Sequence, residues 1–338
     1  MTKELYTLLV AALENKPSAN FSADDVNTAA VNALAAELGL DANASVRDFR
    51  TVENRAFALI EEAVDEILPK KLESVVGEFA EIKSYPRDAE IVFNIEKIGK
   101  NRAKLTISKG ARGGIYRAAR LDSKHFSLSA STYTVSVYVT LEEILLGTMS
   151  LSELFNNILE GFEEIVYKEV FTALATGSAA MGVEHKVTST KANLGTALDS
   201  VLPIVKGYGI PTIFGFYETV SNIYNPLAST TTGYPNNEDS ADIRRYGHVQ
   251  VYKGVKVVEL PNYIIADNGD TNVTWAYDTD KVFVVPSGAK PVKVGLRGEM
   301  YIQKNVQAVG SEKWEAHKMM GVGVAMANNY AVITVTAE

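Results

Sequence analysis

The sequence predicts an α+β fold in which a helical amino-terminal region precedes a chain of mixed helices and strands. Three observations carry this prediction. Residues 1–84 show helical periodicity, residues 126–141 alternate apolar and polar side chains as a long strand does, and residues 151–175 repeat apolar side chains every three or four positions. Beyond residue 191, helical and strand patterns alternate, and the carboxyl end is rich in strands.

The composition is typical of a globular protein large enough for two domains. The chain has 338 residues, with a hydrophobic content of 46% and a charged content of 22%. No apolar run approaches the roughly 20 residues that cross a membrane, and the acidic start of the chain is typical of a short helix and not of a signal peptide. Because cysteine is absent, disulfides, thiolate metal sites and thiol nucleophiles are excluded, which suits a reducing cytoplasm.

The net charge of −8 is unevenly distributed along the chain. Residues 85–124 carry ten Lys/Arg against four Asp/Glu, whereas residues 1–84 carry fifteen acids against eight bases. The sequence therefore contains a basic segment within an acidic chain.

The strand and helix at residues 126–175 organise the rest of the chain. The alternation of the strand slips by one residue near Tyr133, which predicts a β-bulge. Ser150 and Glu153 form a capping box that opens the helix, and Gly177 can close it. A strand and a helix of this length favour an extended, flat subunit.

The amino-terminal region predicts three helices, at residues 4–13, 22–38 and 51–82. Pro69 lies inside the third helix and is expected to kink or break it, because proline lacks an amide donor and clashes with the preceding turn. Two readings of this region stay open: a helical lobe that packs on its own domain, or an arm that packs on neighbouring copies.

Residues 85–124 predict an extended basic β-hairpin. Apolar side chains alternate at 91–95 and again at 103–107, around a turn at 99–102. Because an isolated hairpin is marginal in water, we expect this one to lie on an acidic surface of an adjacent copy; the alternatives are that it folds back on its own subunit or that its charges are solvated. The predicted inter-subunit contact residues are Lys97, Lys100, Arg102, Lys104, Lys109, Arg112, Arg117 and Arg120 on the hairpin, and Glu142, Glu143, Glu160, Glu163 and Glu164 on the acidic surface.

The remaining chain predicts an α/β segment followed by strands. The expected helices are 194–208 and 217–224, and a polar loop is expected at 226–242. The expected strands are 211–216, 248–252, 255–260, 273–277, 281–285, 292–302, 314–326 and 330–336.

The sequence offers no catalytic, cofactor-binding or metal-binding residue. Its four histidines are far apart and have no metal-site spacing. There is no phosphate-binding loop, no nucleophile elbow and no dinucleotide fingerprint. We therefore expect no enzyme and no cofactor.

Taken in order, these parts resemble the major capsid protein of tailed bacteriophages, whose Hong Kong-type fold is shared with encapsulin shells and with herpesvirus capsid floors. The resemblance covers about residues 51–336. It is carried by element order and by residues 101–116 (NRAKLTISKGARGGIY), 138–147 (YVTLEEILLG), 151–154 (LSEL), 160–164 (EGFEE) and 314–322 (WEAHKMMGV).

The resemblance implies a phage capsid fold with a helical amino-terminal arm, an extended loop that lies across a neighbouring subunit, a peripheral domain with a spine helix, and an α/β axial domain. The implied bounds are 1–84 for the arm, 85–124 for the loop, 125–191 with 290–338 for the peripheral domain, 151–175 for the spine helix and 192–289 for the axial domain, with 226–242 as a candidate axial-tip loop. Some family members join a loop lysine to an asparagine of another subunit. Possible donors here are Lys97, Lys100, Lys104 and Lys109 and a possible acceptor is Asn305, but no motif selects a pair.

The implied function is structural. Identical subunits would self-assemble through hexamers and pentamers into the icosahedral head of a tailed double-stranded DNA phage. The expected location is the virion, after assembly in the host cytoplasm. Portal, scaffold and decoration proteins are further expected partners, with DNA enclosed without sequence-specific binding and no membrane involved.

Three other functions stay open at this point. An encapsulin-type compartment would purify with a protein cargo. An enzyme with an unrecognised site would form a small oligomer and hold perturbed titratable groups. A nucleic-acid-binding protein would use the basic hairpin and bind DNA with a steep salt dependence.

Overall fold

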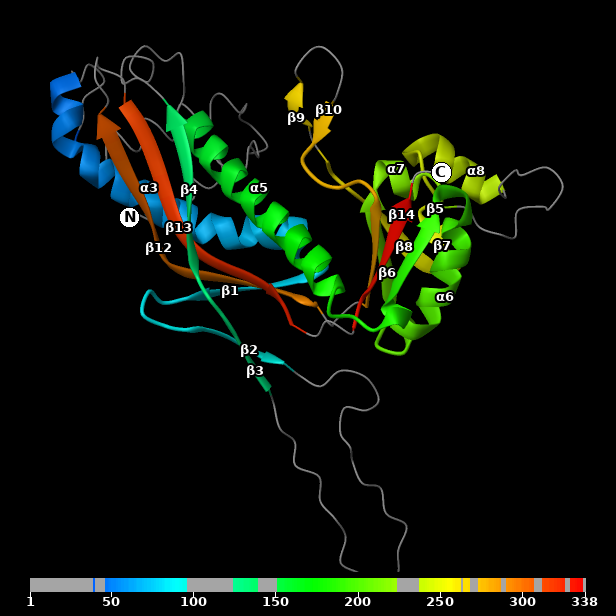
Figure 1. Ribbon diagram of the computed structural model, residues 1–338. Helices are drawn as coiled ribbons and strands as arrows, with labels where there is room; N and C mark the ends of the chain where they lie inside the picture. The colour runs from blue at the N-terminus through cyan, green and yellow to red at the C-terminus, as the bar shows by residue number, and fades with distance from the viewer. Residues whose placement is uncertain are drawn as a thin grey trace, which may run out of the picture.

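The computed structural model describes residue 39 and residues 46–95, 124–138, 151–223, 237–262, 264–267, 273–286, 290–306, 312–325 and 329–336. Within these ranges the chain forms a four-stranded sheet with two long helices, and beside it a six-stranded sheet with shorter helices (Figure 1). The mixed α+β class predicted from the sequence is confirmed.

The four-stranded sheet has the order β1 (Ala80–Tyr85), β12 (Val292–Val306), β13 (Glu312–Val324) and β4 (Ser131–Tyr138). β1 is parallel to β12, and the other pairs are antiparallel. The helices α3 (Val46–Val76) and α5 (Leu151–Ser178) pack on one face of this sheet.

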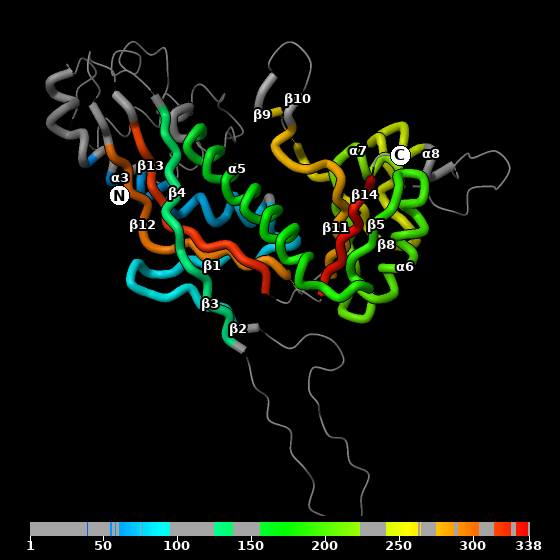
Figure 2. The backbone as a smooth tube through the Cα atoms, in the orientation of Figure 1, coloured from blue at the N-terminus to red at the C-terminus, as the bar shows by residue number. Residues whose placement is uncertain are grey.

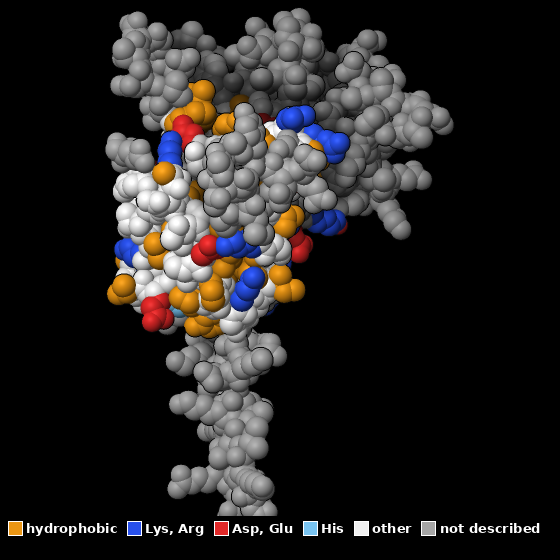
Figure 3. Space-filling model, turned by 90° about the vertical axis from the view of Figure 1, so that its right-hand side faces the viewer, with side chains coloured by type: hydrophobic (Ala, Val, Ile, Leu, Met, Phe, Trp, Pro, Cys, Tyr) orange, Lys and Arg blue, Asp and Glu red, His pale blue; other side chains and the backbone are white. Residues whose placement is uncertain are grey.

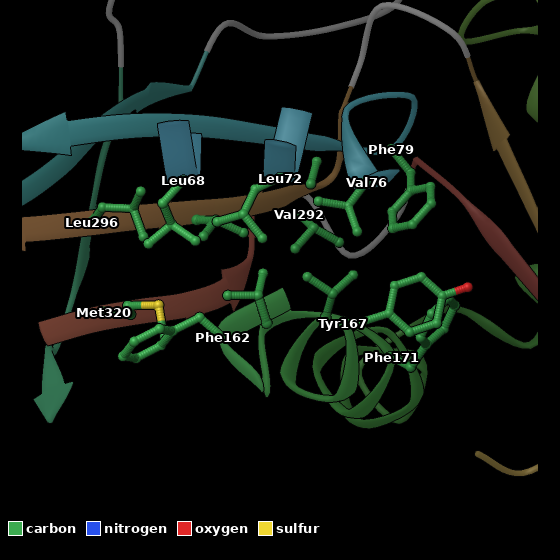
Figure 4. Close-up of a cluster of buried hydrophobic side chains, with 14 of the residues drawn as sticks. Leu68, Leu72, Val76, Phe79, Phe162, Tyr167, Phe171, Val292, Leu296 and Met320 are labelled. Carbon is green, nitrogen blue, oxygen red and sulfur yellow. The ribbon is translucent and has the colours of Figure 1, made fainter. Parts of the chain in front are cut away.

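A continuous core fills the space between these two helices and the sheet (Figure 4). Leu68, Leu72 and Val76 of α3 face Val292 of β12, and Phe162 of α5 lies on the other side of the same cluster. The same core includes aromatic rings of the six-stranded sheet, since the core cluster extends to the rings of Phe214, Phe216 and Phe283. The two sheets therefore share one apolar core, and a second core lies between the six-stranded sheet and the helix at residues 194–206.

α3 begins at Val46 and not at the predicted residue 51, and it differs from its prediction at two further places. The helix continues through Pro69, so the predicted break is wrong; Leu68 and Leu72, 1% and 0% exposed, hold the helix in the core on both sides of the proline. The helix also ends at Val76, and Ala80–Tyr85 is a strand and not the helix predicted as far as residue 82. Parallel pairing with β12 overrides the local helical pattern there.

The long strand predicted at residues 126–141 is interrupted. β3 (Lys124–Leu128) and β4 are separate strands, so the break lies at residues 129–130 and not at a bulge near Tyr133. β3 pairs with β2 (Ile91–Ile95), and β4 pairs with β13. The partner predicted for β2, residues 103–107, lies outside the described residues.

The six-stranded sheet has the order β5 (Lys186–Thr190), β14 (Ala331–Thr336), β11 (Lys281–Pro286), β6 (Pro211–Phe216), β8 (Val255–Leu260) and β7 (Val251–Tyr252). The helix α6 (Leu194–Lys206) covers it with Leu198, Val201 and Val205, which are fully buried. The remaining described elements are the 3₁₀ turns Val183–His185 and Lys191–Asn193, α7 (Tyr217–Val220), α8 (Asn237–Tyr246), and a ribbon of β9 (Ile264–Asp267) and β10 (Val273–Trp275).

Several sequence predictions for this part need correction. Asn237–Tyr246 is helical although a loop was predicted at 226–242; Arg244 and Arg245 in the last turn favour this helix through its dipole. The helix predicted at 217–224 is only one turn long, and the strand predicted at 248–252 begins at Val251.

Sheet membership also differs from the predicted domain bounds. β5 and β14 belong to the six-stranded sheet, whereas the sequence analysis grouped them with the long helix. β14 is buried along Ala331–Ile333 because it lies between β5 and β11, which explains its nearly continuous apolar pattern.

Candidate functional site

The hairpin root consists of β2, which the sequence predicted as a hairpin strand, and β3, which the sequence predicted as the start of the long strand at 126–141. The strands are antiparallel, with Phe93 opposite Phe126 and Ile91 opposite Leu128. Ile91 is 1% exposed and Phe93 is 0% exposed. Since two strands alone cannot bury side chains this completely, the burial comes from the surface on which the root lies.

That surface is a glycine seat, formed by Gly295 of β12 and by Gly321 and Gly323 of β13. Gly295 is opposite Gly321, and Gly323 lies two residues further along its strand, so all three are on the same face of the sheet. A Cβ atom at Gly295 would lie 2.2 Å from Cγ2 of Ile91, and one at Gly323 would lie 2.5 Å from Cδ2 of Leu128. The missing side chains therefore make the space that the hairpin root occupies.

A buried lysine holds the root beside the seat. Lys293, 5% exposed, forms an ion pair with Glu81, and its Nζ lies 5.9 Å from the centre of the Phe93 ring. Nζ of Lys83 lies 5.2 Å from the same ring and 2.6 Å from a Glu81 carboxylate oxygen. Burial acts to raise the pKa of Glu81, but hydrogen bonds and charges from the two lysines outweigh it, so this pKa lies below its usual value.

The turn between β1 and β2 is held from two sides. The hydroxyl of Tyr85 donates to the carbonyl of Val92 at 2.6 Å, and burial raises the pKa of this tyrosine. Nε of Arg297 donates to the carbonyl of Arg87 at 2.7 Å. The seat, the lysine and these two hydrogen bonds together give the hairpin root one defined position on the four-stranded sheet.

The structure describes only part of the predicted contact set. The eight basic residues predicted as contacts on the hairpin lie outside the described residues: Lys97, Lys100, Arg102, Lys104, Lys109, Arg112, Arg117 and Arg120. Glu142 and Glu143 lie outside them too. The possible cross-link acceptor Asn305 lies on β12, opposite Lys313 in register.

The three described glutamates lie on α5, but they do not share one environment. Glu160 and Glu164 are exposed and one turn apart. Glu163 is partly buried and pairs with Lys71 of α3 at 3.2 Å, so one of its contacts is within its own subunit. Sequence reasoning treated the three as one surface because spacing alone does not show which face of a helix meets α3.

Sequence reasoning missed the glycine seat and the Glu81–Lys293 pair. Gly321 and Gly323 lie within a strand pattern, and a glycine at such a position is a sequence signal for a close backbone approach. Lys293 gave no such signal, because its partner lies 212 positions away.

No converging catalytic or metal-binding group was found in the described part of the chain. No group of three or more His, Asp or Glu side chains there could hold a metal ion. His185 is buried and its Nδ1 lies 3.0 Å from the carbonyl of Tyr330, while Nδ1 of the buried His248 lies 3.3 Å from Glu259. On the face seen in Figure 3, the described basic and acidic side chains are interspersed among apolar ones.

One cleft of about 520 Å³ lies between α5 and the segment around β10 and β11. Five of its twelve lining residues are aromatic, and its ionic groups are Lys168 and the Asp278–Lys281 pair, which is joined at 2.9 Å. None of the described helices is long and apolar enough to cross a membrane.

A family model identifies the chain. The family described as "SPbeta prophage-derived putative capsid protein YonB" matches residues 4–336. No curated protein matches the chain significantly.

Solved capsid structures share the fold at low sequence identity. The procapsid of satellite phage P4, in a structure that includes the size determination (Sid) protein, matches with a TM-score of 0.54, 9% identity, and 87% of this chain and 99% of the other covered. The mature capsid of bacteriophage PhiM1 matches with a TM-score of 0.52, 9% identity, and 77% and 86% covered. The capsid of cyanophage P-SCSP1u matches with a TM-score of 0.50, 12% identity, and 78% and 88% covered.

The family match covers nearly the whole chain, and the fold that it implies is the one that the structure has. Both indicate a structural role in a virion shell. The chain therefore belongs to the YonB family of phage capsid proteins, and it has the fold of the solved phage capsid structures.

Proposed function

We propose that copies of this chain assemble through hexamers and pentamers into the icosahedral head of a tailed phage, and that the basic hairpin holds adjacent copies together. The observation that carries the proposal is the fixed hairpin root. Ile95 and Lys124 are opposite each other, so the two ends of the basic segment 96–123 are held side by side on the body. A basic loop with a fixed base suits a defined contact with a neighbouring surface.

The acidic surface of that neighbour would include Glu160 and Glu164, which are exposed on α5. Glu142 and Glu143 precede the same helix in sequence and carry the same charge. Each exposed ion pair contributes only about 0–1 kcal/mol. Many such contacts act together in a closed shell, because each one raises the effective concentration for the next.

In this proposal the unit around the four-stranded sheet is the peripheral domain and the unit around the six-stranded sheet is the axial domain. The sheet membership of β5 and β14 supports moving both strands into the axial domain. The described amino-terminal helix α3 packs on β12 of its own subunit and would belong to the peripheral domain.

The shell would enclose double-stranded DNA without reading its sequence, and it would form in the host cytoplasm with portal, scaffold and decoration proteins as further partners. The net charge of −8 supports this role, because an acidic subunit does not bind the phosphate backbone strongly during packaging. The match to a phage capsid family favours a head over an encapsulin-type compartment.

Electron microscopy of the purified full-length chain tests the proposal. We expect closed shells from the wild type, and folded subunits without normal shells after deletion of residues 99–114. Normal shells from the deletion variant would refute the role of the hairpin.

A charge exchange tests the partner surface more sharply. Replacing Arg102 and Lys104 by glutamate, or Glu160 and Glu164 by lysine, should each weaken assembly, and combining the four changes should restore it. As a control, the exposed pair Glu66 and Lys70, joined at 3.2 Å on α3, is exchanged in the same way and should leave assembly unchanged. Failure of the combined variant to recover would place the hairpin contact elsewhere.

A further inference from the structure

The two longest strands of the protein bend where their pairing is irregular. Arg297 of β12 is opposite Met319 of β13, but the next regular pair joins Tyr301 to His317, so β12 has extra residues at this point. Gly298 lies within the irregularity and has a φ of +68°, which favours glycine. Such a bulge bends the strand, and both strands change direction part-way along their length (Figure 2).

A buried ion pair spans this bulge. Lys318 of β13 lies opposite the irregular segment and is 5% exposed. Its Nζ donates to Oδ1 of Asp65 on α3 and to the carbonyl of Gly298, both at 2.5 Å. The other carboxylate oxygen of Asp65 accepts the backbone N–H of Met300 at 2.6 Å. One carboxylate thus contacts both strands at the bend.

A second carboxylate of α3 continues the contact along the same edge of β12. Glu61, one helical turn from Asp65, accepts the backbone N–H of Ile302 at 2.6 Å. β1 ends at Tyr85, opposite Arg297, so beyond the bulge it no longer pairs with this edge. The two carboxylates take the place of the carbonyl groups that a further strand would offer.

The bulge separates the hairpin from the rest of the sheet. β1 and Gly295 of the glycine seat lie before it, whereas the edge bound by Glu61 and Asp65 lies beyond it. The angle at the bulge therefore sets the direction in which the hairpin root points relative to the half of the sheet that lies beyond the bulge, and α3 contacts β12 on both sides of the bend. Buried hydrogen-bonded charges have narrow geometric requirements, and they can specify one conformation in that way.

We propose that Asp65 and Lys318 are positioning residues for assembly: their ion pair fixes the bend of β12 and β13, and with it the angle at which each copy presents its hairpin. The consequence for shells rests on the proposed function, since a closed shell needs a defined angle between the contact surfaces of one copy. The bend itself is a property of the single subunit and can be measured without assembly.

Distance measurements between spin labels on unassembled, full-length subunits test the bend. Because the chain has no cysteine, Ser127→Cys on the hairpin root and Gln303→Cys beyond the bulge give two unique and exposed labelling sites. The test variant combines Asp65→Asn with Lys318→Met, which removes both charges while an amide oxygen still accepts the N–H of Met300. The control combines Glu66→Gln with Lys70→Met, which removes an exposed pair from the same helix.

The wild type and the control should give one narrow distance distribution, and the test variant a broadened or shifted one. Identical distributions in all three proteins would overturn the proposal, and so would a test variant whose shells keep the wild-type diameter despite a changed bend. If the test variant does not fold, the distances are measured in Lys318→Arg instead, under the same criteria. This substitution keeps the positive charge but changes the length and shape of the side chain. Absence of shells from the wild type would refute the proposed function and leave the bend measurement valid.

Discussion

Substitution of Gly295 by alanine should detach the hairpin root from its seat. The new Cβ would lie 2.2 Å from Cγ2 and 3.1 Å from Cδ1 of Ile91, and Ile91 is 1% exposed and cannot move aside freely. Overpacking of a buried site costs about 1–3 kcal/mol. Alanine has less conformational entropy than glycine in the unfolded chain, and this offsets up to about 1 kcal/mol of the lost stability. We therefore expect a net loss of about 1–2 kcal/mol in the free energy of unfolding.

Urea denaturation measures this loss, and hydrogen exchange of the β2 and β3 amides locates it. Gly182→Ala is the matched control, because nothing lies within 4 Å of its added Cβ and its φ of −62° suits alanine. The double variant Gly295→Ala with Ile91→Ala should be less destabilised than the sum of the two single variants, since the clash is between these residues. A neutral Gly295→Ala, or strict additivity in the cycle, would refute the role of the seat.

Three further predictions follow from described contacts. Asp65→Ala should lower the free energy of unfolding by about 3–5 kcal/mol, because it leaves Lys318 buried without its counter-charge. The combination of Asp65→Asn with Lys318→Met removes both charges and should lower the free energy of unfolding much less. Thermal and urea unfolding of the two variants distinguish these outcomes. Burial and nearby acids raise the pKa of Glu61 above 4.5, so protonation of Glu61 stabilises the folded state. The free energy of unfolding of the wild type, relative to that of Glu61→Gln, should therefore fall as the pH rises from 4.5 through the raised pKa. Parallel curves of the two free energies against pH would contradict this. Acrylamide should quench Trp275, which is 41% exposed, but hardly Trp314, which is 1% exposed, so Trp275→Phe should leave a blue-shifted, poorly quenched emission.

The correct sequence predictions were made where the apolar residues recur with a strong helical or strand period. The apolar repeat of α5 placed its start at Leu151, and the strand patterns of β6, β8 and β11 matched the observed strands closely. These elements bury one face of a helix or the whole of a short strand, so the spacing of apolar residues in the sequence shows which positions are buried. The order of such elements, together with the family-like sequence of residues 101–116, 138–147, 151–154, 160–164 and 314–322, indicated the capsid family.

The error at Ala80–Tyr85 and the contacts that the sequence did not reveal occur where a distant segment decides the structure. Ala80–Tyr85 could continue a helix by its own pattern, but β12 offers a parallel partner more than 200 positions later. The Asp65–Lys318 contact joins residues 253 positions apart, and each alone is an ordinary charged residue. The glycine seat was visible only as unexplained glycines, because what fills the space above them is contributed by another part of the chain.

A cryo-electron microscopy map of shells assembled from the purified chain tests the central claim most directly. We predict that the hairpin root of each copy lies on its own Gly295, Gly321 and Gly323, and that residues 96–123 of that copy contact the α5 surface of a neighbour. A chain that stays monomeric at every concentration and salt condition, or a map in which residues 96–123 lie against their own subunit, would contradict it.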